Sequence, residues 1–380
     1  MWTAESLKSF GWNIQKLIDK EDLTRDESQE MFREVLQNQQ PDLQQGAFLA
    51  ALSAKGETPA EIAGAWQAIR ELDTETVTED LGSPLVENSG TGMDQLKTFN
   101  VSSAAAIVAA AAGTRMARHG ARALTSSCGT VDLLESIGIN VECDVDTVSH
   151  SIKTAGIGLF NGMSTLVHPR SLARILSQIR FGSTLNIAAS LASPCKTTHA
   201  LRGVYSAEMV TKVGEIMKAI GIERAIVVHG YDADREKGMD ELSNIGESIA
   251  LEIRSDGSEV FHTIVPEEVG LNRSQFGDIA AMGDVRKESV RFLRVISGID
   301  HHGCIDITCL NAGAVLYLVG KTKDIAEGVC MSKEIIGSGR ALQKLTEWVN
   351  TQSDQQKNGI RSLLSVAEAA GVKQMMQPYL

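Results

Sequence analysis

The sequence has 380 residues, of which 22% are charged and 43% apolar, and its formal net charge is −12. These proportions are typical of a soluble globular protein, and the length suits one large domain plus a smaller one. The acidic balance argues against a nucleic-acid surface, because binding a phosphate backbone requires a basic face. We therefore do not expect nucleic acid to be the main partner.

The cysteines and the amino terminus predict the cellular compartment. The chain has six cysteines, Cys128, Cys143, Cys195, Cys304, Cys309 and Cys330. None forms a C-x₂-C pair, so neither a zinc site nor a redox dithiol is indicated. No basic segment followed by an apolar stretch opens the chain, so we predict no signal peptide. The expectation is a cytoplasmic protein with reduced thiols and no membrane partner.

Residues 5 to about 72 have a helical pattern throughout. Apolar residues recur at helical spacing in the first segment, as at Leu7, Phe10 and Ile14. Thr58 followed by Pro59 marks a helix start, with a capping residue and then a proline at the first helical position. We predict four helices that form a small domain over residues 1–75, followed by an acidic connection.

From Leu85 onward, strand and helix patterns alternate, which is typical of a parallel sheet with crossover helices. Residues 225–230 predict a buried strand and residues 259–264 a strand near an edge. Residues 305–310 are interpreted as a loop that approaches a core helix over residues 312–319. The predicted fold class is α/β, with a mainly parallel central sheet flanked by helices, in a domain over residues 76–350.

Two more helices are predicted near the end of the chain, over residues 338–348 and 363–370. The second lies in a C-terminal extension, residues 351–380. The sequence pattern assigns this extension no function.

The stretch from Asn88 to Asp132 contains two turns rich in glycine and hydroxyl residues, each followed by a predicted helix. The first turn, residues 89–94, leads through Asn100 to a small-residue apolar helix over residues 104–112. The second, residues 125–130, precedes a helix over residues 131–137. Helix N-termini carry unpaired N–H groups and the positive end of the helix dipole, so they attract anions.

Cationic residues stand between these two turns. They are Arg115, Arg118, His119 and Arg122. Together with the turns they predict a pocket for a phosphorylated ligand, and Asp94 beside it would suit a hydrated Mg²⁺.

The order of these motifs resembles the anthranilate phosphoribosyltransferase family. The matching segments are GTG-x-D at residues 90–94, TFN-x-SS at 98–103, RHG-x-R at 118–122 and SSCGTVD-x-LE from residue 126. The resemblance continues at residues 204–205, 225–230, 238–243 and 310–312, and covers the chain from about residue 5 to about residue 348. It implies transfer of 5-phosphoribosyl from 5-phosphoribosyl-1-pyrophosphate (PRPP) to anthranilate, in tryptophan biosynthesis, or to a related aromatic or heterocyclic nitrogen acceptor, with release of pyrophosphate. It also implies the small helical domain, Mg²⁺ as cofactor and a homodimer.

The resemblance assigns three sets of site residues. Those that would bind PRPP are Gly90, Thr91, Gly92, Asp94, Thr98, Asn100, Ser102, Ser103, Arg118 and Cys128. Those that would hold the metal are Ser102, Asp240 and Glu241. Those that would bind the acceptor are His119, Gly120, Ala121, His168 and Arg180. The segment of about residues 165–195, which carries the last two, is expected to pack on the helical domain. No residue is expected to act as a covalent nucleophile, because positioning and electrostatics carry this reaction.

Five residues depart from the family pattern, namely Met93, Gln95, Ala121, Cys128 and Gly182. Met93 and Gln95 replace glycines of the first turn, and Cys128 replaces a serine with a weaker donor. Ala121 and Gly182 remove an amide and an arginine from the acceptor side. Two hypotheses stay open. One is a Mg²⁺-dependent phosphoribosyltransferase acting on anthranilate or another acceptor, and the other is a non-catalytic relative that binds nucleic acid or another anion in the same cleft. A phosphorylase on the same fold is a third, weaker option, and the acidic charge favours the first.

Overall fold

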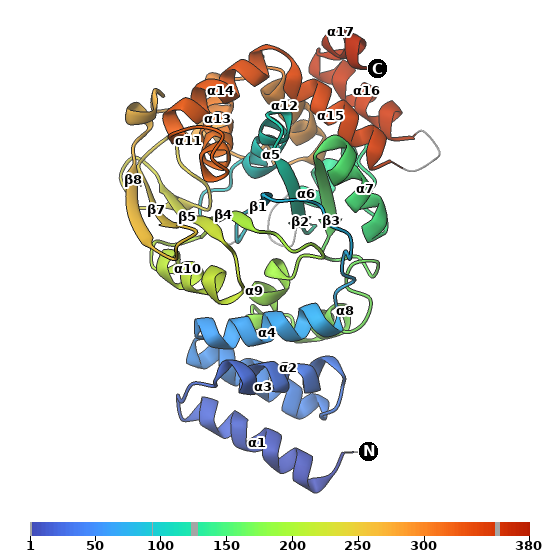
Figure 1. The fold of residues 1–380 in the computed structure, drawn as a ribbon, viewed down its shortest axis with the longest axis vertical. Coiled ribbons are helices and arrows are strands. Elements are labelled where there is room, and N and C mark those ends of the chain that lie inside the picture. The colour runs from blue at the N-terminus through green and yellow to red at the C-terminus, as the bar shows by residue number, and fades with distance from the viewer. Residues whose placement is uncertain (1, 93, 123–127, 354–357) are drawn as a thin grey trace.

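The computed structural model describes residues 2–92, 94–122, 128–353 and 358–380. The chain forms a helical lobe at its N-terminal end and a larger α/β lobe (Figure 1). Four helices build most of the helical lobe: α1 Ala4–Ile18, α2 Arg25–Leu36, α3 Asp42–Lys55 and α4 Pro59–Leu72. This arrangement confirms the predicted fold class and the four predicted helices.

Local capping sets the starts of two of these helices. Thr24 accepts from the Glu27 backbone N–H while the Glu27 side chain accepts from the Thr24 backbone, and Thr58 and Glu61 repeat this capping box before α4. Each box satisfies N–H groups that would otherwise lack partners. Two later helices, α8 Leu172–Ile179 and α9 Thr184–Leu191, share the apolar core of this lobe.

The α/β lobe is built on one twisted sheet. Its strands are β1 Leu85–Ser89, β2 Arg115–Gly120, β3 Ile157–Asn161, β4 His199–Gly203, β5 Arg224–Tyr231, β6 Gly238–Met239, β7 Ser248–Ile253 and β8 Glu259–Ile264. Their order is β3-β2-β1-β4-β5-β7-β8, and β6 pairs with β5. The strands from β3 to β5 in this order are parallel, whereas β6, β7 and β8 are antiparallel to their neighbours. The strand predicted near an edge is the edge strand β8.

The strand order reverses between β1 and β4. From β1 the chain passes through α5, Val101–Ala111, to β2 on one side, and from β4 it passes through α10, Met209–Ala219, to β5 on the other. In open α/β sheets, ligands bind outside the carboxyl ends of the strands at such a reversal. The topology therefore places a binding site beyond Ser89 and Gly203.

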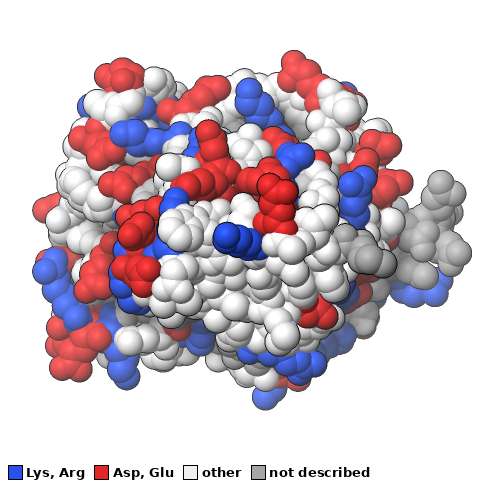
Figure 2. Space-filling view, turned by 90° about the horizontal axis from the view of Figure 1, so that it is seen from below, with Lys and Arg blue, Asp and Glu red and all other residues white. Residues whose placement is uncertain are grey.

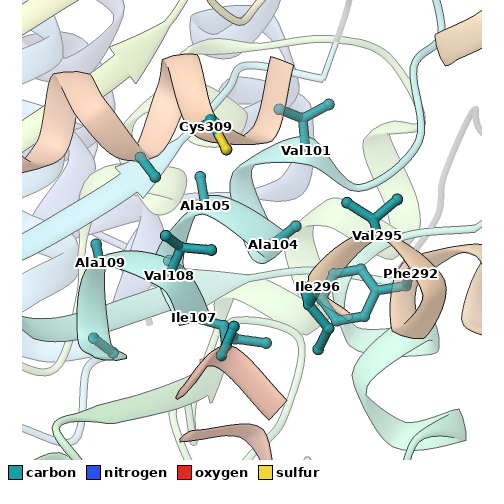
Figure 3. Close-up of a cluster of buried hydrophobic side chains, with 14 of the residues drawn as sticks. Val101, Ala104, Ala105, Ile107, Val108, Ala109, Phe292, Val295, Ile296 and Cys309 are labelled. Carbon is teal, nitrogen blue, oxygen red and sulfur yellow. The ribbon is translucent and has the colours of Figure 1, made fainter. Parts of the chain in front are cut away.

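Alternate strand residues point into different cores. Leu201, Ile226 and Val228 face the core around α5, while Ala200 and Val227 face the core around α10. The remaining helices are α6 Thr130–Ser136, α7 Val145–Ala155, α11 Phe276–Ile279, α12 Val285–Ile296, α13 His302–Leu318, α14 Ile325–Gly337, α15 Arg340–Thr351, α16 Asn358–Ala370 and α17 Lys373–Met376, with 3-10 turns at Pro266–Val269 and Gln377–Tyr379. Figure 3 shows α5 packed against Phe292, Val295 and Ile296 of α12 and Cys309 of α13.

One predicted boundary is wrong. Residues 305–310 belong to α13, which is a continuous helix from His302 to Leu318. Its threonine, cysteine and glycine residues are weak helix formers, so local propensity alone suggested a loop. Burial between α5 and α14 overrides that propensity, and the His301 side chain caps the helix by accepting from the Gly303 backbone N–H.

The C-terminal residues complete the larger core. Leu363, Val366 and Ala367 of α16 are buried in the same cluster as α5, and Met376 of α17 joins them. In the part of the chain that the structure describes, none of the helices has the length and apolar character needed to cross a membrane.

Candidate functional site

Three carboxyl groups meet at the carboxyl edge of the sheet. Asp94 follows β1, while Asp240 and Glu241 follow β6, and one oxygen from each lies within 4.8 Å of the others. Lys97 Nζ lies 2.8 Å from Asp94 Oδ1 and supplies a positive charge beside them. The two chain segments are joined by a backbone hydrogen bond, which the Leu96 N–H donates to the Gly238 carbonyl oxygen at 3.1 Å.

These carboxyl groups raise one another's pKa. Burial raises the pKa of Asp94 to about 6, and the charge of Asp240 adds to this. The pKa of Glu241 is well above its ordinary value because of burial and the charges of Asp240 and Asp94. Glu241 Oε2 is buried without a hydrogen-bond partner among the described residues. A divalent cation would relieve this repulsion and satisfy the bare oxygen, so the donor set fits Mg²⁺.

The glycine turn is folded onto this carboxylate cluster. A Cβ atom at Gly90 would lie 2.2 Å from Asp240 Oδ2, so a side chain there would displace the carboxylate. Gly92 has a φ of +73°, and its backbone N–H donates to Asp240 Oδ2 at 2.6 Å. Thr91 Oγ1 is buried and has no partner in the described structure. Met93 lies outside the described residues, and Gln95 is exposed.

Ser102 and Thr98 connect the cluster to α5. Ser102 lines one small cavity together with Asp240 and Glu241, and Thr98 Oγ1 donates to Glu241 Oε1 at 3.2 Å. The three residues predicted to hold the metal are therefore neighbours of one cavity. Asp94, predicted to bind PRPP and its ion, is a fourth member of this group.

Arg118 is buried on β2 with much of its hydrogen-bonding capacity unused. Its Nη2 donates to Ser102 Oγ at 3.2 Å, whereas its Nε and Nη1 are buried without a partner in the described ranges. Burial lowers its pKa to about 10, and Glu87 opposes this shift. Ser103 Oγ is also buried and unpartnered within those ranges. Because unpaired buried cations are unfavourable, these donors suit an anionic ligand.

Asn100 occupies the N-cap position of α5, yet its side chain makes no capping hydrogen bond. Its Nδ2 lies 3.9 Å from Cys128 Sγ. Burial raises the pKa of Cys128 to about 12, so the thiol is neutral and a weak donor. Thr125, Ser126 and Ser127, the hydroxyl residues before Cys128, lie outside the described residues.

Two predicted acceptor residues form a ring pair. His119 and His168 pack edge to face with centroids 5.5 Å apart, and both Nε2 atoms are buried without a partner among described residues. His168 Nδ1 lies 2.6 Å from the Asp73 carbonyl oxygen, which orients its ring. Burial lowers the pKa of His119 to about 3, the charges of His168 and Arg202 lower it further, and a hydrogen bond to the Ser190 backbone opposes them. Both imidazoles are therefore neutral at pH 7.

The other predicted acceptor residues have different surroundings. The Gly120 carbonyl oxygen accepts from the Gly162 backbone N–H at 2.8 Å, and Ala121 is exposed. Arg180 is exposed at the C-cap of α8, and its Nε donates to the Ser177 carbonyl oxygen of that helix at 3.2 Å. In the described structure, Arg180 is therefore bonded to its own helix α8, and no hydrogen bond joins it to His119 or His168.

Sequence reasoning missed a buried arginine beside these histidines. Arg202, near the end of β4, is 3% exposed and bonds to Ser89 and Ser190. The signal was a charged residue inside an apolar strand pattern, since arginine is rarely buried unless it has partners.

Arg122 and Arg115, the remaining arginines of the predicted basic patch, have different surroundings, since Arg115 is exposed and Arg122 is paired. Arg122 pairs with three carboxylates, Asp132 at 3.2 Å, Glu135 at 2.6 Å and Glu142 at 3.5 Å. Its charge is thereby neutralised, which weakens the hypothesis of nucleic-acid binding.

Comparison with known families agrees with this site. Residues 13–72 match the helical bundle domain of the glycosyl transferase family, and residues 82–342 match its a/b domain. The chain therefore belongs to this glycosyl transferase family. Comparison with individual proteins narrows this assignment, because relatives more than 30% identical over most of the chain show that it is a member of the anthranilate phosphoribosyltransferase family.

Three relatives illustrate the similarity. An anthranilate phosphoribosyltransferase of Methanothermobacter marburgensis is 33% identical over 344 residues, which cover 89% of this chain and 97% of that protein. The crystal structure of anthranilate phosphoribosyltransferase from Thermus thermophilus is 32% identical with a TM-score of 0.79, over 89% of this chain and 98% of that one. The Saccharomyces cerevisiae enzyme in complex with PRPP and Mg is 22% identical with a TM-score of 0.78, over 92% of this chain and 98% of that one. At that identity the likeness shows the fold alone.

Proposed function

We propose that the protein transfers the 5-phosphoribosyl group from PRPP to the nitrogen of an aromatic amine, with anthranilate as the first candidate, and releases pyrophosphate. One observation supports this most strongly: near the strand reversal lie a carboxylate cluster and buried cationic and hydroxyl groups, some of which have no partner among the residues that the structure describes. A sugar diphosphate with a divalent cation has the charges that would satisfy both groups.

Mg²⁺ would be held by Asp94, Asp240 and Glu241, with Ser102 beside them. When bound, the ion would neutralise negative charge that develops on the departing pyrophosphate. Gly92 holds Asp240 in place through its backbone N–H, and Thr98 does the same for Glu241 through its hydroxyl group. The residues of the chain thus fix the carboxylates before the donor binds.

The donor phosphates would lie against Arg118 and the start of α5. Among the described residues, Nε and Nη1 of Arg118 and the hydroxyl of Ser103 are buried donors without a partner, and an anion that accepts their hydrogen bonds would offset the cost of burying them. The positive end of the α5 dipole adds to this attraction.

The acceptor would lie beside His119 and His168. Because His119 is neutral, its Nε2, which has no partner among the described residues, can accept a hydrogen bond from the attacking amine and help to orient it. A hydrogen bond to the Asp73 carbonyl oxygen holds the His168 ring in place against His119.

Two finer statements belong to this proposal. The six cysteines are free thiols, which suits the reducing cytoplasm. The helical lobe exposes Trp12 and Leu43, at 69% and 88%, and Figure 2 shows a broad area with few charged side chains at this end of the molecule. Apolar exposure of this kind suits an interface, so we propose a homodimer formed through α1 and α3.

The test is pyrophosphate release by the purified protein with PRPP, anthranilate and MgCl₂, compared with the same mixture containing EDTA. We expect metal-dependent release with anthranilate or another aromatic amine. Absence of release with every amine tested, in a protein whose thermal unfolding is unaffected by PRPP and Mg²⁺, would show that the proposal is wrong.

A further inference from the structure

Lys97 supplies a positive charge to the cluster of three carboxyl groups. Its Nζ lies 2.8 Å from Asp94 Oδ1 and donates to the Gly92 carbonyl oxygen, also at 2.8 Å. Within the described residues, this is the only ion pair that includes Asp94, Asp240 or Glu241. A single ammonium group thus pairs with a cluster that can carry up to three negative charges.

The charge of Lys97 acts on the whole cluster. Burial raises the pKa values of all three carboxyl groups, and the charge of Lys97 opposes the rise in each. The charge of Arg202 acts in the same direction on Asp240. Arg202 Nη1 also lies 3.8 Å from the carboxylate of Glu87, so its charge is shared between two acidic groups. Lys97 is therefore the cation that belongs to the cluster itself.

The side chain of Lys97 can leave the cluster while its backbone stays in place. The Lys97 carbonyl oxygen accepts from the Ala281 backbone N–H at 2.8 Å. The side chain of Lys97 is 37% exposed, whereas that of Asp94 is 6% exposed. An ammonium group on a flexible four-carbon stem regains its hydration when it rotates toward solvent. The cation is therefore the part of this arrangement that can be exchanged.

Resting on the magnesium site of the function proposed above, we propose that Lys97 is a built-in counter-ion that competes with a divalent cation for the carboxylate cluster. In the empty site the ammonium group offsets part of the repulsion among the carboxylates. The same positive charge opposes the approach of a second cation, and its bond to Asp94 must break before that oxygen can serve as a metal ligand. Lys97 therefore stabilises the metal-free protein and weakens its affinity for the metal.

The experiment measures Mn²⁺ binding to the full chain by electron paramagnetic resonance, without PRPP, in wild type, Lys97→Gln, Lys97→Arg and Lys323→Gln. Mn²⁺ is the probe because it prefers the same oxygen ligands as Mg²⁺. We expect Lys97→Gln to bind Mn²⁺ about 10-fold more tightly than wild type, because the competing charge is gone. Lys97→Arg keeps the charge and should stay within about threefold of wild type. Lys323 is exposed, so Lys323→Gln, which changes the net charge equally, should match wild type.

The melting temperature gives a second readout. Without metal, Lys97→Gln should melt below wild type, because the carboxylates lose the charge that offsets their repulsion. Saturating MnCl₂ should remove most of this difference, since a ligand that binds the folded state more tightly stabilises it more. Lys323→Gln should melt as wild type does under both conditions.

Either readout can overturn the inference. Equal or weaker Mn²⁺ binding by Lys97→Gln contradicts the competition, as does Lys97→Arg that binds as tightly as Lys97→Gln. An unchanged melting temperature of metal-free Lys97→Gln contradicts the role as a counter-ion. Should Lys97→Gln fail to fold, Lys97→Met removes the charge and keeps an unbranched stem, and the same outcomes decide.

These measurements separate the inference from the proposed function. If wild type releases pyrophosphate with Mg²⁺ while Lys97→Gln binds Mn²⁺ no more tightly, the role of Lys97 is wrong and the proposed function stands. If neither protein binds Mn²⁺, the cluster is no metal site in the free protein and the inference is wrong, whereas metal-dependent release of pyrophosphate still decides the proposed function.

Discussion

At the residue scale, the site contains groups of like charge that lie close together and repel one another when no ligand is bound. Asp94, Asp240 and Glu241 place three carboxyl oxygens within 4.8 Å with Lys97 as a nearby cation. Arg118 and Arg202 share the charge of Glu87. Like charges at this distance destabilise the folded protein, so binding energy and folding energy compete here.

The substitution Asp240→Asn should separate the effect of this carboxylate on ligand binding from its effect on folding stability. We expect kcat/KM for PRPP to fall about 100-fold or more, because a ligand for the ion that stabilises developing charge is weakened. The metal-free variant should melt no lower than wild type, since repulsion with Asp94 and Glu241 is relieved. Steady-state kinetics and calorimetry measure both quantities, with the exposed Asp234→Asn as the control.

An Asp240→Asn variant that keeps wild-type activity would contradict the proposed role of this carboxylate in metal binding. A metal-free variant that melts far below wild type would equally contradict it, because the carboxylate would then be stabilising the fold.

His119 predicts a dependence of stability on pH. Its pKa in the folded protein is about 3, against an ordinary value of 6.5. Between these values the folded state binds fewer protons than the unfolded state, so its contribution to stability is present above pH 6.5 and is lost as the pH falls toward 3. The variant His119→Asn should therefore lose less stability than wild type between about pH 7 and pH 4.5.

Urea unfolding at several pH values measures this difference. The exposed His150 offers a matched substitution, His150→Asn, which should follow wild type. Parallel curves for wild type and His119→Asn would show that the buried imidazole does not resist protonation.

At the scale of elements, close helix packing depends on particular glycines. A Cβ atom at Gly313 of α13 would lie 2.7 Å from the Val329 backbone nitrogen of α14, and one at Gly328 would lie 2.5 Å from the Gly313 carbonyl oxygen. The two backbones therefore touch, which holds the core helix against α14.

Substitution Gly313→Ala should force these helices apart. We expect a loss of about 1–3 kcal/mol in the free energy of unfolding, as for an overpacked core. Gly337, also in α14, has open space around its Cβ position, so Gly337→Ala should be neutral or stabilising by about 0.5–1 kcal/mol. Denaturant unfolding measures both, and equal effects of the two substitutions would contradict the packing argument.

At the scale of the whole molecule, the C-terminal helices and the helical lobe make different contributions. Residues 351–380, which the sequence marks as an extension, place Leu363 in the core of the α/β lobe. We infer that they fold with that lobe as one unit.

Substitution Leu363→Ala tests this. A cost of about 2–5 kcal/mol in the free energy of unfolding is expected for a buried leucine, in a single transition with the rest of the lobe. Met375 is 40% exposed, so Met375→Ala should change stability by less than about 0.5 kcal/mol. A separate early transition for the tail would show that it folds independently.

The proposed dimer is also testable at this scale. The double substitution Trp12→Glu and Leu43→Glu places charges on the exposed apolar face of α1 and α3 and should convert the protein to a monomer with unchanged secondary structure. Light scattering gives the mass in solution. Phe261→Glu, at a site 62% exposed on β8, is the control and should leave the mass unaltered.

The resemblance indicated some site residues that the structure brings together, whereas the surroundings of others became clear only in the three-dimensional structure. Motif order indicated Asp94, Asp240 and Glu241, and the structure places them in one cluster. Arg180 was chosen because it was near in sequence to the expected position, yet a left-handed residue at the end of α8 leaves it exposed. Proximity along the chain does not fix the direction of a side chain after a helix ends.

The sequence by itself determined the two-lobe α/β fold, because capping boxes, helical periodicity and apolar strand runs are local signals. It also indicated the carboxylates and the glycine turn through the order of the motifs. Only the tertiary structure decided that 305–310 is helical, that α16 belongs to the core, and that Arg202 lies between Ser89 and Ser190. Each of these depends on contacts between distant segments, whose energies outweigh local propensity and which no single stretch of sequence contains.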